Sequence, residues 1–230
     1  MLPQAGGHQL LKVKGTSVIK PTKLSEVEFY KTYLPKYPQL HKFLPKFYSY
    51  GLTSDIKDMY TQDEYNMIQT KQYTHYIELE NLVLKNNVDI IDLKLGSIHW
   101  LSTATQKDID ATKTRNKLSI IDNYKFRLDG AIVDNVKYEK ELCRNMTIRE
   151  VTNVLKQIKN LHKLKEWIDE LLLVLPSIDL NIYGPSILLV VNDDYVNIKL
   201  IDFTSYEELS DKMDDLVEAL KIISLFIVSI

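Results

Sequence analysis

Glycine is scarce in this chain: only 7 of its 230 residues are glycine. No three of them form the pattern G-x-G-x-x-G, and the pattern G-x-x-x-x-G-K-[ST] is absent. Loops of these two kinds hold phosphate groups with backbone amides in dinucleotide-binding folds and in P-loop proteins. The sequence therefore excludes both classes, and any phosphate that this chain binds must be held by side chains.

The composition is otherwise that of an ordinary globular protein. Hydrophobic residues make up 45% of the chain and charged residues 26%, which is too apolar for a disordered chain. The length allows one large domain or two small lobes. A formal net charge of −2 argues against a protein that coats nucleic acid through bulk charge.

The sequence also indicates the compartment of the protein. The single cysteine, Cys143, excludes a disulfide framework and a zinc site built from cysteines. The first residues lack the apolar segment of a signal peptide, and the apolar run 222–230 is too short to span a bilayer. We therefore expect a soluble monomer in the cytoplasm or the nucleus, without membrane insertion or a nucleic-acid partner.

Charge is unevenly distributed along the chain. Residues 10–48 contain eight lysines and two glutamates, a balance of +6. Residues 202–218 contain seven acidic residues and one lysine, a balance of −6. Solvated faces that happen to segregate explain this pattern as well as a molecule with one side that faces anions.

Strand-like segments dominate the first part of the chain. Two short runs, 9–14 and 16–20, meet at Gly15, which is suited to a tight turn, and we expect Pro21 to end the second run. Longer strands rich in aromatic and β-branched residues are expected at 47–51, 73–79, 88–96 and 124–133.

Helices are predicted by their start signals. Ser25-Glu26-Val27-Glu28 has the pattern of a capping box and predicts a helix to about Tyr33. Thr147-Ile148-Arg149-Glu150 is a second capping box, which begins a helical run to Leu161. The polar stretch 53–70 is expected to be a loop or a short helix. The last part should contain a helix at 164–175, a strand hairpin at 186–192 and 195–203, and a final helix from about Glu207.

This order of elements predicts an α+β fold with two lobes. The first lobe covers residues 1–79, a connection follows at 80–85, and the second lobe covers residues 86–230.

Asp92-Leu93-Lys94-Leu95-Gly96 is the first candidate for chemistry. An acid and a lysine two positions apart on a strand point to the same face. Their apolar neighbours predict burial, which is unfavourable for both charges unless they bind something. An ion pair between them at the end of a sheet is the structural alternative.

Two further charged residues end apolar strands. Asp202 follows Leu200-Ile201, a place where phosphotransferases hold Mg²⁺, although an aspartate there is also a common helix N-cap. Lys20 ends the run Val18-Ile19, like a lysine that neutralises ATP phosphates, although lysines often end strands. Neither residue is a specific signal on its own. The order of the three candidates along the chain is specific.

In this order the chain resembles the inositol polyphosphate kinases. The signature P-x-x-x-D-x-K-x-G of that family stands here as Val88-Asp89-Ile90-Ile91-Asp92-Leu93-Lys94-Leu95-Gly96. The other similar blocks are Gly7-His8, Ile19-Lys20-Pro21, Glu28-Phe29-Tyr30, Leu79-Glu80-Asn81-Leu82, Phe126-Arg127-Leu128-Asp129-Gly130, Ser186-Ile187-Leu188-Leu189-Val190 and Ile201-Asp202-Phe203. The chain departs from the family pattern at Val88, Pro185, Ser205 and Asn81, which leaves the substrate preference open.

The resemblance implies a two-lobed fold, distantly similar to protein kinases, with an antiparallel sheet and a helix in the first lobe. It also implies ATP and Mg²⁺ as cofactors. Lys20 would contact the ATP phosphates, and Asp92 would bind the ribose hydroxyls. Glu80 and Leu82 would meet adenine through backbone groups, Ser186 would lie near the phosphates, Asp202 would bind Mg²⁺, and Lys94 would contact both the substrate and the phosphate in transfer.

The family's layout places the inositol phosphate at residues 97–123. This segment is rich in cationic side chains, and we expect substrate contacts from His99, Lys107, Lys113 and Lys117. An ordinary solvated helix face is the alternative for these lysines.

The resemblance implies an enzyme that transfers the γ-phosphoryl group of ATP to an inositol phosphate. The short substrate segment favours inositol hexakisphosphate, which would give a diphosphoinositol phosphate. A multikinase or an inositol trisphosphate kinase that acts on a ring hydroxyl is one alternative. A module that binds inositol phosphates with weak catalysis is the other, and the presence of Lys20, Asp92, Lys94 and Asp202 argues against it. A phosphotransferase of the protein-kinase type is disfavoured because H-R-D-x-x-x-x-N and D-F-G are absent.

Overall fold

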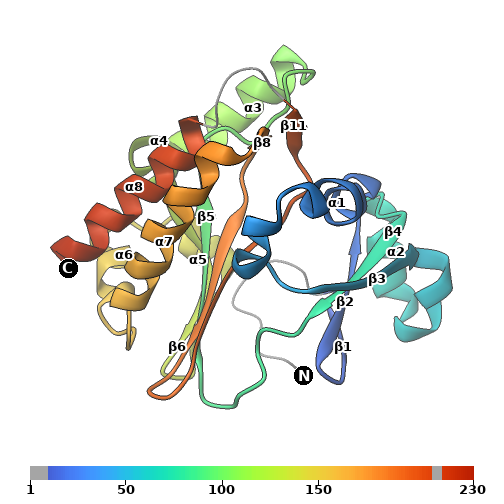
Figure 1. Ribbon diagram of the computed structural model, residues 1–230, viewed down its shortest axis with the longest axis horizontal. Helices are drawn as coiled ribbons and strands as arrows, with labels where there is room; N and C mark the ends of the chain where they lie inside the picture. Colours follow the sequence, from blue (N-terminus) through green and yellow to red (C-terminus); the bar gives the residue numbers. More distant parts are fainter. Residues whose placement is uncertain (1–9, 209–213) are drawn as a thin grey trace.

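The computed structural model describes residues 10–208 and 214–230 of the chain (Figure 1). These residues form antiparallel sheets of four and five strands, a short two-stranded sheet, and helices. The α+β class predicted from the sequence is confirmed. No helix within the two ranges is long and apolar enough to cross a membrane. Gly7 and His8, which belong to the family resemblance, and Asp211 of the acidic segment lie outside the described residues.

The four-stranded sheet is formed by N-terminal residues and lies on the right of Figure 1. Its strands have the order β1-β2-β4-β3, and all neighbours are antiparallel. Gly15 has a φ of +61° in the turn between the first two strands, as its position predicts. The strands are β1 (Lys12–Lys14), β2 (Ser17–Thr22), β3 (Phe47–Leu52) and β4 (His75–Glu80).

β2 continues through Pro21, so the prediction that this proline ends the strand is wrong. Pro21 pairs with Tyr76 of β4 on one side. On the other side β1 pairs only with Ser17, Val18 and Ile19, so no strand of residues 10–208 and 214–230 pairs with Pro21 at this edge of β2. A proline is tolerated at an edge without a described partner strand, because its missing amide hydrogen removes no ladder hydrogen bond that the described residues form there.

The helix after β2 begins with α1 (Leu24–Glu28), which continues into a π-helical turn, Phe29–Tyr33. Lys23, and not Ser25, occupies the N-cap position. The Ser25 hydroxyl instead donates a 2.8 Å hydrogen bond to the carbonyl oxygen of Thr204, far away in the sequence. The predicted capping box at Ser25 is therefore wrong, because a tertiary contact uses this hydroxyl.

Helical turns connect the strands of this first sheet. The polar stretch 53–70 is helical, and the Thr61 side chain accepts a hydrogen bond from the Glu64 amide at the start of its second helix. The connecting segments are the 3₁₀ helices Leu34–Lys36, Pro38–Phe43 and Thr53–Met59, and α2 (Gln62–Thr70).

The five-stranded sheet has the order β10-β9-β5-β6-β7 and is antiparallel throughout. β5 therefore lies at its centre. Its strands are β5 (Asp89–Leu95), β6 (Phe126–Val133), β7 (Val136–Tyr138), β9 (Ser186–Val191) and β10 (Val196–Ile201). The hairpin of β9 and β10 is the one predicted. β8 (Leu180–Ile182) pairs with β11 (Tyr206–Glu208), so Glu207 lies in a strand and does not begin the final helix as predicted.

The helices of the second half follow the predicted apolar faces with changed ends. Thr147 caps α6 and exchanges hydrogen bonds with Glu150, which confirms the second capping box. α6 ends at Leu155 rather than Leu161, and the next helix begins at His162. The helices are α3 (Gln106–Lys117), α4 (Ile121–Tyr124), α5 (Lys140–Arg144), α6 (Ile148–Leu155), α7 (His162–Val174), the 3₁₀ turn Leu175–Ser177 and α8 (Asp214–Ser229).

The two faces of the five-stranded sheet have different neighbours. Ile91 and Leu93 of β5 belong to the main core, which α6, α7 and α8 cover on the left of Figure 1. Ile90 belongs to a smaller apolar cluster on the opposite face. Side chains alternate along a strand, so Asp92 and Lys94 also lie on the face away from these helices.

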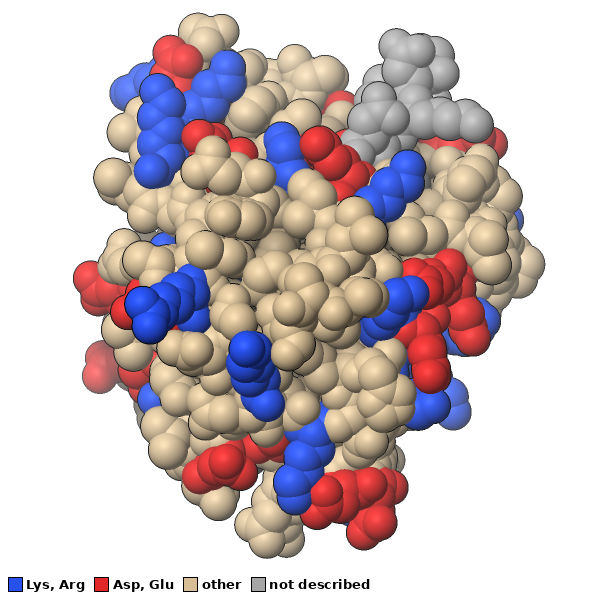
Figure 2. Space-filling view, turned by 90° about the vertical axis from the view of Figure 1, so that its left-hand side faces the viewer, with Lys and Arg blue, Asp and Glu red and all other residues tan. Residues whose placement is uncertain are grey.

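The final helix is largely part of the core, as its apolar sequence predicts. Leu216, Leu220 and Ile223 of α8 are buried, whereas Leu225 and Val228 are exposed. Figure 2 views the molecule from this helical side, where a broad uncharged area lies between charged side chains.

Candidate active site

Lys20 of β2 lies in a buried network with two carboxylates. Its Nζ is 2.7 Å from Asp202 Oδ1 and 2.8 Å from Glu26 Oε1. Burial alone would lower the pKa of Lys20, but the charges of Asp202 and Glu26 raise it above the ordinary value. The amine is therefore a permanent cation, held between the first sheet and the end of β10.

Glu26 connects this network to the aromatic core. Its Oε1 also accepts a 3.1 Å hydrogen bond from the Phe203 amide, and its Oε2 accepts one of 2.5 Å from the Thr22 hydroxyl. The ring of Phe203 stacks on Phe29, with ring centroids 4.1 Å apart. Two of the blocks that resemble the kinase family thus pack against each other and fix the residue next to Asp202.

Asp202 has an uncommon backbone conformation. It directly follows β10 and has a φ of +69°, in the left-handed region where residues other than glycine are rare. Short polar side chains such as aspartate tolerate this region best. Its side chain is 27% exposed, against 9% for Lys20, so a ligand can reach this carboxylate from solvent. Residues held in such conformations cluster at functional sites.

Asp92 on β5 is a buried carboxyl group. Its Oδ1 has no hydrogen-bond partner within the part of the chain that the structure describes. Burial, with the negative charges of Asp202 and Asp129, raises the pKa of Asp92 to about 7. The charge of Lys94 and a hydrogen bond with Ser186 oppose this shift without reversing it. Among the ion pairs of residues 10–208 and 214–230, none joins Asp92 to Lys94, so the simple salt bridge is not formed.

Lys94 is held from β5 against the segment before β9. Its Nζ donates a hydrogen bond to the carbonyl oxygen of Gly184, and burial lowers the pKa of this amine. His99 packs on the same glycine, and its Nε2 lies 2.8 Å from the carbonyl oxygen of Gly96. Burial, with the charges of Lys94 and Arg127, lowers the pKa of His99 to about 4, so the ring is neutral.

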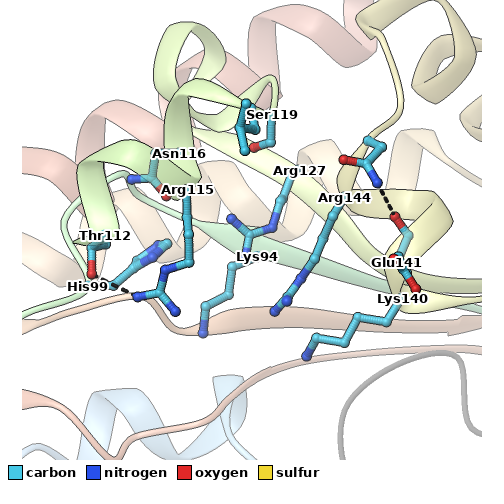
Figure 3. Close-up of a pocket in the computed structure, with 12 residues that line it drawn as sticks. Lys94, His99, Thr112, Arg115, Asn116, Ser119, Arg127, Lys140, Glu141 and Arg144 are labelled. Carbon is cyan, nitrogen blue, oxygen red and sulfur yellow. Dashed lines mark hydrogen bonds between the residues drawn. The ribbon is translucent and has the colours of Figure 1, made fainter. Parts of the chain in front are cut away.

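Lys94 and His99 line a cavity of about 660 Å³ that is strongly cationic. Five of its twelve lining residues are lysine or arginine, and only Glu141 is acidic. Figure 3 shows side chains from several elements entering the same space. The cationic residues are Lys94 from β5, Arg127 from β6, Arg115 from α3, and Lys140 and Arg144 from α5. The cavity can therefore hold a compact anion with several negative groups.

The buried carboxylate of Asp129 contacts three of the cationic side chains that line the cavity. Asp129 Oδ1 is 3.3 Å from Arg127 and 3.1 Å from Arg144 Nε, and its Oδ2 is 2.5 Å from Lys140 Nζ. Burial favours the neutral acid, but the three cations outweigh it and lower the pKa of Asp129 to about 2. Asp129 is thus ionised and pairs with three of the five cavity cations.

The structure brings only part of the predicted substrate set to the cavity. His99 lines it, but Lys107, Lys113 and Lys117 are exposed on α3 and lie outside its lining. α3 turns Thr112 and Asn116 inward, and Arg115 reaches the cavity from the same side. Lys113 Nζ lies instead 6.0 Å from the centre of the Trp100 ring.

Glu80 and Leu82 lie where β4 leaves the first sheet. The Glu80 amide donates a 2.8 Å hydrogen bond to the carbonyl oxygen of Lys46. The carbonyl oxygen of Leu82 accepts hydrogen bonds from the Tyr195 hydroxyl and from Asn197, at 3.2 and 3.5 Å. The segment is thereby tied to both sheets. Ser186 is buried at the start of β9 and pairs in register with Lys94.

The sequence assigns no role to several residues that the structure places here. Glu26 stands in a sequence pattern that predicts a capping box, and this pattern gives no indication of its buried ion pair with Lys20. Arg127 and Asp129 lie within a block similar to the kinase family, and that block is the only signal that could have found them. Arg115 belongs to the cationic segment 97–123 in which the sequence predicts substrate contacts, although the sequence does not distinguish it from the neighbouring lysines. Lys140 and Arg144 carry no local signal, because they meet the other cations only through packing of α5 on the sheet.

Comparison with known proteins agrees with this geometry. Residues 76–220, more than half of the chain, match the family model described as inositol polyphosphate kinase. The chain therefore belongs to the inositol polyphosphate kinase family. No curated protein sequence matches it.

Two solved structures share the fold. One is the inositol phosphate multikinase Ipk2 from S. cerevisiae in complex with ADP and Mn²⁺, with a TM-score of 0.71 and 16% sequence identity over 94% of this chain and 99% of that chain. The other is an inositol phosphate multikinase, with a TM-score of 0.66 and 18% identity over 89% and 98%. The inositol polyphosphate kinase fold implied by the sequence resemblance is thus confirmed.

Proposed function

We propose that the protein is an ATP-dependent kinase that transfers the γ-phosphoryl group of ATP to a highly phosphorylated inositol. The cationic cavity beside Lys94 carries this proposal, because it offers five lysine and arginine side chains in about 660 Å³. A phosphorylated inositol ring is a compact polyanion that suits such a space. We expect inositol hexakisphosphate as the preferred acceptor, with a diphosphoinositol phosphate as the product.

The residues around Lys20 fit the nucleotide. Lys20 supplies a buried positive charge for the phosphates of ATP. Asp92 supplies a buried oxygen that has no partner among the described residues, which suits a ribose hydroxyl. Ser186 lies beside Lys94 in the neighbouring strand and is proposed to face the phosphates. Residues 80–85 are proposed to be the hinge between lobes 1–79 and 86–230, where Glu80 and Leu82 meet adenine.

Asp202 fits a divalent metal ion. Mg²⁺ prefers oxygen ligands and is commonly held by one or two carboxylates together with substrate phosphates. Within 10–208 and 214–230 no group of three or more His, Cys, Asp or Glu side chains is placed to hold a metal ion. The remaining ligands are therefore proposed to be phosphate oxygens and water. The ADP and Mn²⁺ bound to the yeast multikinase support both cofactors.

Lys94 is proposed to act between nucleotide and acceptor. It lines the cavity, and the carboxylates of Asp202 and Asp92 act on its charge. Phosphoryl transfer depends on alignment of the reacting groups and on neutralisation of their charge. A bound metal ion would supply part of that neutralisation, and Lys94 would hold the acceptor and the transferring group in place.

The decisive experiment supplies the wild-type protein with MgATP and inositol hexakisphosphate, and separately with inositol 1,4,5-trisphosphate. Products are then resolved by charge. Transfer to the hexakisphosphate supports the proposal. Transfer to the trisphosphate alone would favour a kinase that acts on ring hydroxyls. Binding of both compounds with no transfer to either would leave only an inositol-phosphate-binding module.

A further inference from the structure

Asp129 sits at an irregularity of the central sheet. Asp92 of β5 pairs with Gly130, but the next residue, Leu93, pairs with Leu128, so Asp129 is an extra residue in β6. A bulge of this kind inserts one residue and re-aims side chains. Arg127, two positions earlier on the same strand, has its side chain on the same face, and Asp129 is the one residue of this stretch of β6 without a register partner on β5.

The contacts of Asp129 arrange the cations around it. Arg127 donates from both Nε and a terminal nitrogen, Arg144 donates from Nε, and Lys140 donates from Nζ. The side chains of Lys140 and Arg144 are 38% and 47% exposed, whereas that of Asp129 is only 7% exposed. The carboxylate is thus buried behind cations that still present part of their surface to the cavity, as Figure 3 shows for Lys140 and Arg144.

Asp129 has two physical effects on the cavity. It holds three long cationic side chains that would otherwise repel one another, and it cancels one of their positive charges. The cluster of Arg127, Lys140 and Arg144 therefore acts on a ligand with a net charge near +2 instead of +3. Since Coulomb energy scales with the charge of the ligand, this loss weakens binding more for an inositol with six phosphates than for one with three.

We propose that Asp129 is a specificity-determining positioning residue, which orders Arg127, Lys140 and Arg144 and restrains the preference of the cavity for the most highly phosphorylated inositols. This inference rests on the proposed function of the same cavity. It assigns a role to a residue that touches the cations and not the substrate.

The test measures, in each variant, the ratio of the KM for inositol 1,4,5-trisphosphate to the KM for inositol hexakisphosphate. In Asp129→Asn the ratio of the two KM values should rise about tenfold at low ionic strength, and the change should shrink as salt is added. Asp129→Glu keeps the charge and should stay within about twofold of the wild type. Glu139→Gln removes an exposed acid that pairs with Lys137 nearby, and it should leave the ratio unchanged.

An unchanged ratio in a folded, active Asp129→Asn protein would overturn the inference. Thermal unfolding and circular dichroism establish whether that variant is folded. If it is not, Lys140→Gln replaces the test, because its partly exposed side chain tolerates substitution. Removal of this cation should lower the ratio several-fold, and no change there would equally refute the role of the cluster. If the wild type phosphorylates neither compound, the proposed function itself has failed.

Discussion

Lys20 and Asp202 are 182 positions apart in the sequence, yet Lys20 Nζ lies 2.7 Å from Asp202 Oδ1. The first residue ends an apolar run in the N-terminal sheet, and the second follows the last strand of the larger sheet. This contact therefore joins the two sheets at the place proposed for the phosphates of ATP. Both residues are already committed to charged partners, so a bound metal ion and nucleotide would have to rearrange this pair.

Asp202→Asn should abolish phosphoryl transfer with little effect on folding. The substitution keeps the shape of the side chain but removes the charge that pairs with Lys20 and is proposed to hold a metal ion. We expect kcat to fall by at least about 100-fold, as is common when one electrostatic contact to the transition state is lost. Transfer of labelled phosphate from ATP measures this effect. Asp193→Asn is the matched control, since Asp193 is exposed and pairs only with Lys159 among the described residues.

Equal activity of Asp202→Asn and the wild type would contradict the metal-binding role. A variant that is inactive and also unfolded at lower urea concentration would instead point to a structural role for the ion pair. The urea midpoint of each protein therefore accompanies every rate.

Local sequence rules predicted much of the fold. The turn at Gly15 and the cap at Thr147 depend on interactions within a few residues, and both are present. Ser25 shows the limit of such rules. Its pattern satisfies a capping box, but its hydroxyl bonds to Thr204, and only the folded chain decides between these partners.

The residues of the candidate site also fall into two groups: those that short sequence motifs predict, and those that only the packing of the fold brings together. Lys20, Lys94 and Asp202 stand in short motifs, and the sequence predicts them in one site. The cations of the cavity come from β5, β6, α3 and α5, and their convergence depends on how these elements pack. A count of lysines in 97–123 therefore could not distinguish residues that face the cavity from those that face solvent.

Arg115 and Lys113 give a direct test of that distinction. They lie two positions apart on α3, but only Arg115 lines the cavity. We expect Arg115→Ala to raise the KM for the inositol phosphate about tenfold, as loss of one charge-assisted contact would. Lys113→Ala should change it by less than about twofold, because Lys113 lies outside the cavity lining and solvent screens its charge from the ligand. Initial rates at saturating ATP measure both values, and the reverse ranking would show that substrate binds along the outer face of α3.

Asp92 makes the stability of the protein depend on pH. Its pKa is raised from 3.8 to about 7 in the folded state, chiefly by burial. The neutral acid is therefore favoured on folding, so its contribution is fully present below pH 4 and is lost as the pH rises to about 7. Asp92→Asn should match the wild type near pH 4 and become more stable above pH 7, by at most about 4 kcal/mol.

Urea unfolding at pH 4, 6 and 8 tests this difference. Other titrating groups cancel, because the same groups are present in both proteins. Asp179→Asn, at an exposed position, serves as the control and should show no growing difference. A difference between Asp92→Asn and the wild type that stays constant with pH would mean that Asp92 is already ionised in the folded protein.

Gly184 tests whether the position of Lys94 depends on close packing. Gly184 has a φ of +55°, and a Cβ there would lie 2.6 Å from His99 Cδ2 and 3.3 Å from Lys94 Cε. The His99 ring is itself held by Gly96, so a methyl group should displace Lys94 as well as strain the backbone. Gly184→Ala should therefore lower kcat about tenfold or more, and lower the free energy of unfolding by roughly 2 kcal/mol.

Gly15→Ala separates the backbone strain at a positive φ from the displacement of Lys94. Gly15 has a similar φ of +61°, but no atom lies within 4 Å of a Cβ placed there. It should therefore show only the backbone cost of about 1 kcal/mol, with unchanged kcat. Unfolding in urea and initial rates with MgATP measure both quantities. If both variants kept the wild-type kcat, close packing of His99 and Lys94 against Gly184 would not be needed to hold the lysine in place.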